Sequence, residues 1–187
     1  MRLFVALEIP SAVRQNLAAL LVELRTITKE PRWVRPENLH VTLKFLGEVA
    51  EEKVNSVRSA LRQVRSEQVV TLKFCGLGSF PNEKHPHVFW AGMKAAANLK
   101  PLAADIEIAM EKQGIPREKR EFSPHLTLAR FERGHFPEAL RKAIAANAQR
   151  EFGSLRTNEF HLIQSKLRPS GAEYTTLERF QFAARVE

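Results

Sequence analysis

Apolar residues recur along the chain at two spacings, one typical of strands and one typical of helices. Residues 2–8 predict a first strand, and a helix is expected to begin at Pro10 and Ser11, because the apolar residues that follow share one helical face. Further strands are predicted at about 40–46, 68–75, 87–93, 125–131, 155–165 and 174–183, and further helices at about 51–64, from Leu99 to Gly114, and from Pro137 onward.

The order of these elements mixes strands and helices without strict alternation. This order favours an α+β fold with antiparallel sheets over a doubly wound parallel sheet. A chain of 187 residues suits one compact domain or two small lobes that share a core. Because no stretch has the composition of a flexible linker, we expect residues 1–187 to form a single bilobal domain.

The chain carries 29 Lys and Arg against 21 Asp and Glu, a formal net charge of +8. Such an excess raises the encounter rate with polyanions such as RNA, although many basic proteins bind none. The one cysteine, Cys75, excludes an internal disulfide and a paired-cysteine zinc site. No apolar run approaches the ~20 residues that span a bilayer, and the N-terminal apolar stretch is too short for a signal peptide. We therefore expect a cytoplasmic protein without membrane association.

One short motif occurs twice, at His40–Leu43 (HVTL) and at His125–Leu128 (HLTL). Six histidines and eight threonines in 187 residues give roughly a quarter of one H-x-T by chance, so two copies are a signal, although a single copy would not be. The copies start 85 residues apart, close to half the chain, which fits two related lobes facing each other across a cleft. Strand alternation places each histidine and threonine on one face and the apolar residues on the other.

Two imidazoles and two hydroxyls around one point suit phosphoryl chemistry without a metal. Histidine titrates near ~6.5, so one ring can take a proton from attacking water while the other donates a proton to the leaving oxygen. The hydroxyls of Thr42 and Thr127 can donate to the non-bridging phosphate oxygens. A zinc site is the weaker interpretation, because two histidines lack a third ligand at fixed spacing. We therefore predict catalysis by His40 and His125 with no metal and no cofactor.

At these residues the chain resembles the two-histidine (2H) phosphoesterase superfamily, and in particular the bacterial and archaeal RNA 2′,3′-cyclic phosphodiesterases, historically called 2′-5′ RNA ligases. The resemblance covers nearly the whole chain. It is carried by the opening strand at 2–7, the first motif with its flanks at 33–47, the second motif at 123–130 and the closing hairpin at 165–174.

The resemblance implies a bilobal α+β fold in which antiparallel sheets line a central cleft and helices lie outside. It implies hydrolysis of a 2′,3′-cyclic phosphate at an RNA 3′ end, tRNA fragments included, to a 2′-phosphate, and we expect a monomer. It makes His40 the proton donor and His125 the proton acceptor, and it assigns Arg130 to phosphate binding. Strict alternation puts Arg130 on the face opposite His125, so either the strand twists or ends before it, or Arg130 is a solvated arginine.

Three functions stay open at this point. The first is the RNA cyclic phosphodiesterase. The second is a related phosphodiesterase acting on small cyclic nucleotides, or a reversible 2′-5′ RNA ligase. The third is an RNA-end-binding module without turnover, against which the intact motifs argue, since binding alone does not need two titratable imidazoles.

Several other residues have two interpretations. The aromatic residues Phe4, Trp33, Phe45 and Tyr174 could stack on a terminal base or belong to the core.

By parity, Lys44 shares the face of His40 and Thr42, where it would meet RNA or solvent. His161 is expected on a sheet surface, with the cleft as the alternative.

Overall fold

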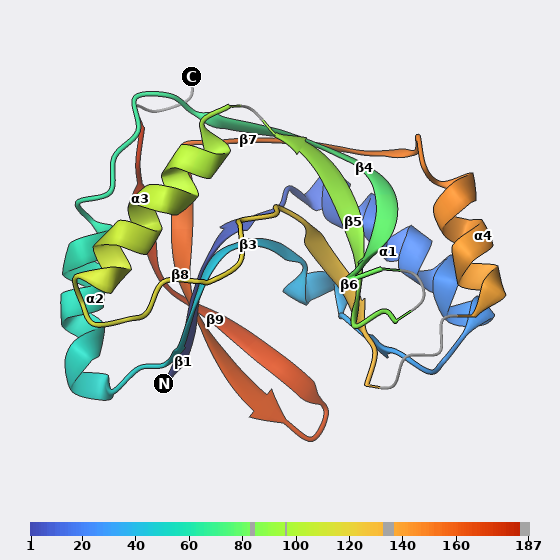
Figure 1. Cartoon of the computed structure of the whole chain (residues 1–187), viewed down its shortest axis with the longest axis horizontal. Coiled ribbons are helices and arrows are strands. Elements are labelled where there is room, and N and C mark those ends of the chain that lie inside the picture. The colour runs from blue at the N-terminus through green and yellow to red at the C-terminus, as the bar shows by residue number, and fades with distance from the viewer. Residues whose placement is uncertain (83–84, 96, 133–136, 184–187) are drawn as a thin grey trace.

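The computed structural model describes residues 1–82, 85–95, 97–132 and 137–183. The strands described there form two antiparallel sheets, which confirms the predicted α+β class (Figure 1). The four-stranded sheet has the order β3 (His40–Glu48), β1 (Arg2–Glu8), β8 (Glu159–Arg168) and β9 (Gly171–Gln181). The five-stranded sheet has the order β2 (Arg32–Trp33), β6 (Leu126–Arg130), β5 (Val88–Ala95), β4 (Val70–Phe80) and β7 (Glu151–Thr157).

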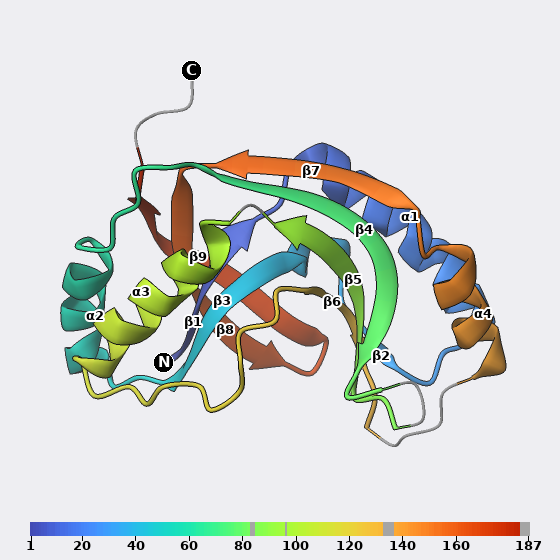
Figure 2. The same ribbon diagram turned by 45° about the horizontal axis from the view of Figure 1, so that its top comes forward.

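The helices join the two sheets, because two of them follow a strand of one sheet and pack on the other. Helix α1 (Ser11–Ile27) follows β1 but packs on β7, together with α4 (Glu138–Ala146), which packs on β4. Helix α3 (Leu99–Glu111) follows β5 but packs on β3, beside α2 (Val54–Leu61). Figure 2 shows α1 and α4 at one end of the molecule and α2 and α3 at the other. Two short 3₁₀ turns, η1 (Pro36–Asn38) and η2 (Glu51–Lys53), precede β3 and α2.

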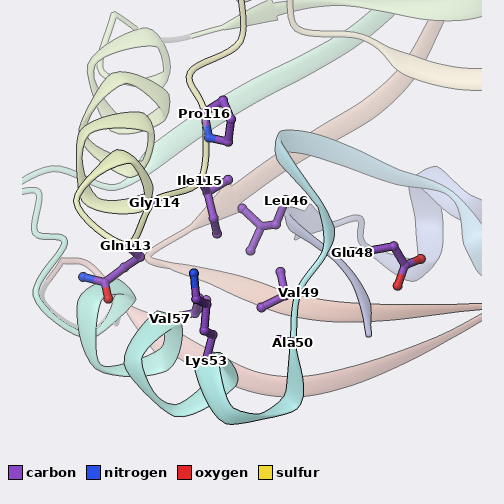
Figure 3. A pocket seen from close by; sticks show the side chains of 10 residues that line it. All are labelled: Leu46, Glu48, Val49, Ala50, Lys53, Val57, Gln113, Gly114, Ile115 and Pro116. Atoms are coloured by element: carbon purple, nitrogen blue, oxygen red, sulfur yellow. The ribbon is translucent and has the colours of Figure 1, made fainter.

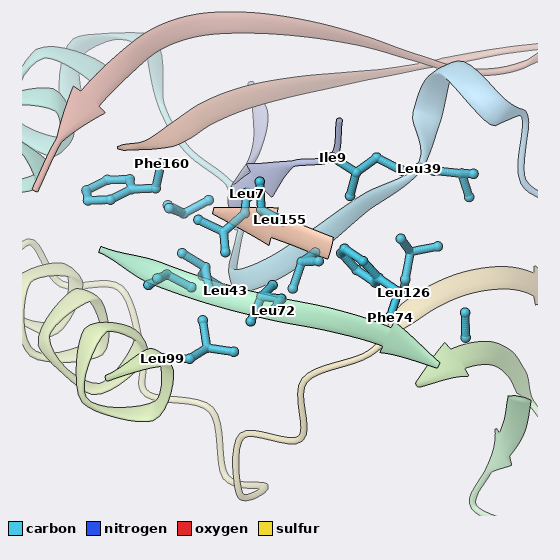
Figure 4. Packing of buried hydrophobic residues seen from close by; sticks show 14 of the residues in the cluster. Leu7, Ile9, Leu39, Leu43, Leu72, Phe74, Leu99, Leu126, Leu155 and Phe160 are labelled. Carbon is cyan, nitrogen blue, oxygen red and sulfur yellow. The ribbon is translucent and has the colours of Figure 1, made fainter. Parts of the chain in front are cut away.

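The main core takes one face of each sheet. Leu7 and Leu43 of the four-stranded sheet and Leu72 and Phe74 of the five-stranded sheet are buried in the same cluster (Figure 4). Residues of β1 at alternate positions belong elsewhere: Phe4 packs with Ala6, Ile163 and Tyr174 in a second, smaller cluster. The four-stranded sheet therefore has a second face on which side chains can surround a ligand.

A β-bulge lies at the same place in both H-x-T-L motifs. In β3, Thr42 pairs with Ala6 and Lys44 with Val5, so Leu43 is an extra residue. In β6, Thr127 pairs with Trp90 and Ala129 with Phe89, so Leu128 is an extra residue. A bulge of this kind sends two successive side chains to one face and restarts the alternation one residue later.

The bulges explain which residues face the core after each threonine. Leu43 and Lys44 are both buried, as are Leu128 and Ala129. The fifth residue after each histidine, Phe45 in one sheet and Arg130 in the other, is exposed instead. The difficulty that strict alternation raised for Arg130 is thereby resolved, since the bulge and not the end of the strand returns it to the side of Thr127.

The prediction that Lys44 shares the face of His40 is wrong for the same reason. Lys44 is only 4% exposed, and its Nζ donates to Glu107 at 2.6 Å and to the carbonyl of Pro116 at 3.0 Å. Both predicted environments, RNA and solvent, are replaced by an ion pair with α3.

The predicted strand at 155–165 is in fact two strands in different sheets. Strand β7 ends at Thr157, and β8 begins at Glu159. The Thr157 hydroxyl bonds the main chain of Glu159 across the break, accepting from its N–H at 3.2 Å.

None of the described helices is long and apolar enough to cross a bilayer.

Candidate active site

His40 opens β3 and is held by main-chain and aromatic contacts. Its Nδ1 lies 2.7 Å from the carbonyl oxygen of Asn38. Because a carbonyl only accepts, Nδ1 carries the hydrogen, and Nε2 is left to exchange a proton with a ligand. The ring packs against Phe4, at 4.7 Å between centroids, and Tyr174, at 5.3 Å, and these two rings also contact each other at 5.0 Å.

His125 immediately precedes β6 and repeats this arrangement. Its Nδ1 donates to the carbonyl of Ser123 at 2.8 Å, and its ring meets the Phe80 ring edge-on at 5.0 Å. In both motifs the orienting carbonyl belongs to the residue two positions before the histidine, so both rings have the same tautomer. Sequence reasoning missed these partners, because a main-chain carbonyl has no residue-type signature.

Burial and a neighbouring cation keep both histidines neutral in the free protein. Burial lowers the pKa of His40 to about 4; the Asn38 carbonyl opposes this shift, and the positive charges of Arg130 and His125 add to it. Burial also lowers the pKa of His125, with the Ser123 carbonyl again opposing and Arg130 again contributing. The positive charge of Arg130 therefore disfavours the imidazolium form of both rings.

A cavity of about 790 Å³ brings the predicted residues of the two motifs together. Its lining includes His40 and Thr42 from one sheet and Thr127 and Arg130 from the other. His125 is not part of the lining, but the two rings are coupled, since a protonated His125 would lower the pKa of His40 further. Four of the five predicted site residues therefore line one cavity.

The cavity lining is rich in arginine, with no aspartate or glutamate among its described residues. The arginines are Arg2, Arg32, Arg35, Arg130 and Arg168. Glutamates outside the lining pair with three of them, namely Arg32, Arg35 and Arg168. Two large apolar side chains in the same lining are exposed, Phe45 at 56% and Leu167 at 70%. The arrangement suits a ligand with both anionic and flat apolar parts.

His161, expected on a sheet surface, is buried instead, at 3% exposure. Its Nδ1 lies 2.9 Å from Glu8 and its Nε2 lies 3.1 Å from Glu159. Glu8 also accepts a hydrogen bond from the Thr176 hydroxyl at 3.0 Å. This cluster braces β1, β8 and β9 and is not part of the cavity lining.

A smaller hollow of about 240 Å³ lies at the far end of β3 (Figure 3). Aliphatic residues such as Leu46, Val57 and Ile115 line it, with Lys53 at its edge, and it contains neither histidine nor threonine. Over the described part of the chain, no group of three or more His, Cys, Asp or Glu is placed to hold a metal ion.

Comparison with known proteins agrees with the geometry. A family model described as LigT-like phosphoesterase matches residues 7–90 and 93–174. The chain is 37% identical over 181 residues to a protein of Archaeoglobus fulgidus named RNA 2′,3′-cyclic phosphodiesterase, covering 97% of this chain and 100% of the relative. A protein of Methanothermobacter thermautotrophicus with the same name is 30% identical, covering 96% and 98%.

Two solved structures show the same fold. The crystal structure of TT0787 of Thermus thermophilus has a TM-score of 0.78 at 32% identity, covering 99% of this chain and 100% of that one. The E. coli LigT complex with 3′-AMP has a TM-score of 0.76 at 27% identity, covering 98% of each chain.

Proposed function

Because this chain belongs to the LigT-like phosphoesterase family, we propose that it hydrolyses 2′,3′-cyclic phosphate ends of RNA to 2′-phosphomonoesters. The observation that carries the proposal is the matched pair of histidines, each with Nδ1 held by a carbonyl: His40 lines a cavity with Arg130, and His125 lies two residues before Thr127 of the same lining. Relatives that share its full length carry the name RNA 2′,3′-cyclic phosphodiesterase, which supports this substrate.

In the proposed reaction a water oxygen attacks phosphorus and the P–O3′ bond breaks. His125 takes the proton from the water, and His40 gives its proton to the O3′ leaving group. In-line displacement needs these groups on opposite sides of the phosphorus, which two strands from facing sheets can provide. Thr42, Thr127 and Arg130 stabilise the non-bridging oxygens as their charge grows.

The depressed pKa of His40 requires the substrate to take part in its protonation. In the free protein His40 is neutral near pH 7, because burial and Arg130 disfavour its cation. A cyclic phosphate carries one negative charge, which offsets Arg130 and favours the imidazolium. We therefore propose that His40 becomes a competent acid only when the phosphate is bound.

The apolar side of the cavity supports RNA over a bare cyclic phosphate. Phe4 and Tyr174 pack on His40, and Trp33 is anchored through its Nε1 to the carbonyl of Thr28 at 3.2 Å. Phe45, of the four aromatic candidates, has the most exposed ring in the cavity. A nucleobase stacked on Phe45 would use that exposed surface, since stacking is how proteins commonly hold unpaired bases.

The test is product analysis on an oligonucleotide that ends in a 2′,3′-cyclic phosphate. We expect a 2′-phosphate, identified by phosphorus NMR against 2′- and 3′-phosphate standards, and a 3′-phosphate would overturn the docking direction. His40→Ala and His125→Ala should each lower kcat by ~10² or more, because each removes one proton transfer. Wild-type activity in either variant would contradict the mechanism, and His85→Ala, in an exposed loop, is the control.

A further inference from the structure

Asn38, the last residue of η1, makes contacts in two directions. Its main-chain carbonyl accepts the hydrogen bond from His40 Nδ1 at 2.7 Å. Its side-chain Nδ2 donates to the carbonyl of Ala172 in β9, also at 2.7 Å. The residue that orients the histidine is therefore itself tied to a strand 134 positions away in sequence.

The strand that Asn38 holds is part of the cavity wall. The end of the β8–β9 hairpin, from Ser165 to Tyr174, supplies a large share of the cavity lining. Figure 1 shows this hairpin projecting from the four-stranded sheet. Arg35 adds a second tie, donating to the carbonyl of Ser170, and Tyr174 packs directly on the His40 ring.

The opposite side of η1 is also held. Arg14 of α1 donates to the carbonyl of Glu37 at 2.9 Å and to that of Pro36 at 3.4 Å. Because Arg14 holds η1 in place, a displacement of the β8–β9 hairpin would be transmitted to Asn38. The Asn38 carbonyl would in turn change the orientation of the His40 ring. The turn thus forms the mechanical connection between the cavity wall and His40.

The second motif has no equivalent connection. Ser123 orients His125 through its carbonyl, but it lies in an exposed segment without regular structure. Within the described residues no side-chain hydrogen bond links Ser123 to a strand. The two rings therefore have the same tautomer and different support.

We infer that Asn38 is a positioning residue that couples the placement of the β8–β9 hairpin to the orientation of His40, an inference that rests on the proposed function. A ligand that fixes the position of the β8–β9 hairpin also aligns the imidazole of His40, which donates its proton to the leaving group. Misalignment of a reacting group by about 1 Å can cost up to ~10² in rate, so loss of the Asn38 side chain should lower kcat by about 10-fold.

Asn38→Ala keeps the main-chain carbonyl and removes the tie to Ala172, together with a side chain of the cavity lining. Asn16→Ala is the matched control, because the Asn16 side chain donates to the carbonyl of Phe152 at 3.0 Å across a similar sequence separation, outside the cavity lining. We expect a roughly 10-fold loss of kcat in the first variant and unchanged kcat in the second. Unchanged kcat in Asn38→Ala would overturn the inference.

The decisive measurement places Asn38→Ala in two backgrounds under single-turnover conditions. If Asn38 acts through His40, its removal adds nothing in His40→Ala protein and keeps its effect in His125→Ala protein. Equal losses in both backgrounds would show a merely structural role. Should the backgrounds be too slow to measure, faster solvent exchange of the His40 Nδ1 proton in Asn38→Ala than in Asn16→Ala supports the inference, and equal exchange overturns it. Absence of turnover in the wild-type protein would instead remove the proposed function.

Discussion

Replacing Arg130 by glutamine should raise the pKa of both histidines. Its positive charge contributes to the lowered pKa of His40 and to that of His125, after burial in each case. Glutamine removes the charge and keeps a polar side chain of similar length. Without the cation, each imidazolium is less disfavoured, so both titrations move toward higher pH.

The size of the effect follows from the pKa of His40. The shift of the His40 pKa from its ordinary value of 6.5 to about 4 corresponds to about 3 kcal/mol in favour of the neutral ring, relative to an exposed histidine. At pH 7 only ~10⁻³ of the molecules then carry the proton. Burial is the largest cause, so Arg130→Gln should recover only part of the difference. The pKa of His40 in the variant should still lie below 6.5.

The assay is a titration of the imidazole carbon-bound protons by NMR, with assignment from His40→Ala and His125→Ala. Arg32→Gln is the control, because Arg32 lines the same cavity but contributes to neither shift. The pH profile of kcat/KM should be bell-shaped for the coupled pair and move to higher pH in Arg130→Gln. A pKa of His40 that is unchanged by Arg130→Gln, or near 6.5 in the wild-type protein, would refute this reasoning.

Three further predictions concern stability and binding. The folded-state pKa of His40 is depressed, so the unfolded state binds more protons, and the free energy of unfolding of the wild-type protein should fall as the pH is lowered from about 6.5 to 4. Denaturant unfolding should show that His40→Ala loses less of its free energy of unfolding over that range, by up to about 3 kcal/mol. Glu107→Ala leaves the Lys44 ammonium buried and should cost about 3 kcal/mol, whereas Lys44→Met should cost less, and activity should survive both; equal costs in urea unfolding would contradict this. The KM for an oligonucleotide should rise with salt far more than that for a cyclic mononucleotide, and equal responses would indicate that the net charge of +8 is incidental to RNA binding.

The histidines and threonines of the candidate site could be picked out from sequence because their pattern is local and duplicated. Histidine and threonine two positions apart share a strand face whatever the rest of the chain does, and a second copy half a chain away indicates a partner. The helix after Ser11 was predictable for a similar reason, since its buried leucines recur at helical spacing. None of these predictions depends on which strands become neighbours.

The features that sequence did not yield depend on pairing between distant segments. A bulge is defined by the strand beside it, so nothing in residues 40–44 alone indicates that Lys44 turns inward. The second motif does contain a hint, because Leu128 and Ala129 are consecutive apolar residues that break the alternation. The break at Asn158 was missed because β7 and β8 have continuous strand-like character and differ only in the sheet they join.

The bulges in the two motifs also make the two ends of the cavity different from each other. Each half of the molecule supplies an imidazole, a hydroxyl and a fifth position that lines the cavity, but that position is Phe45 in one half and Arg130 in the other. A protein made of two copies of the first half would have two phenylalanines and no arginine at these positions, and one made of two second halves would have the reverse. The two ends of the cavity therefore differ in this pair of side chains as well as in the support of their histidines.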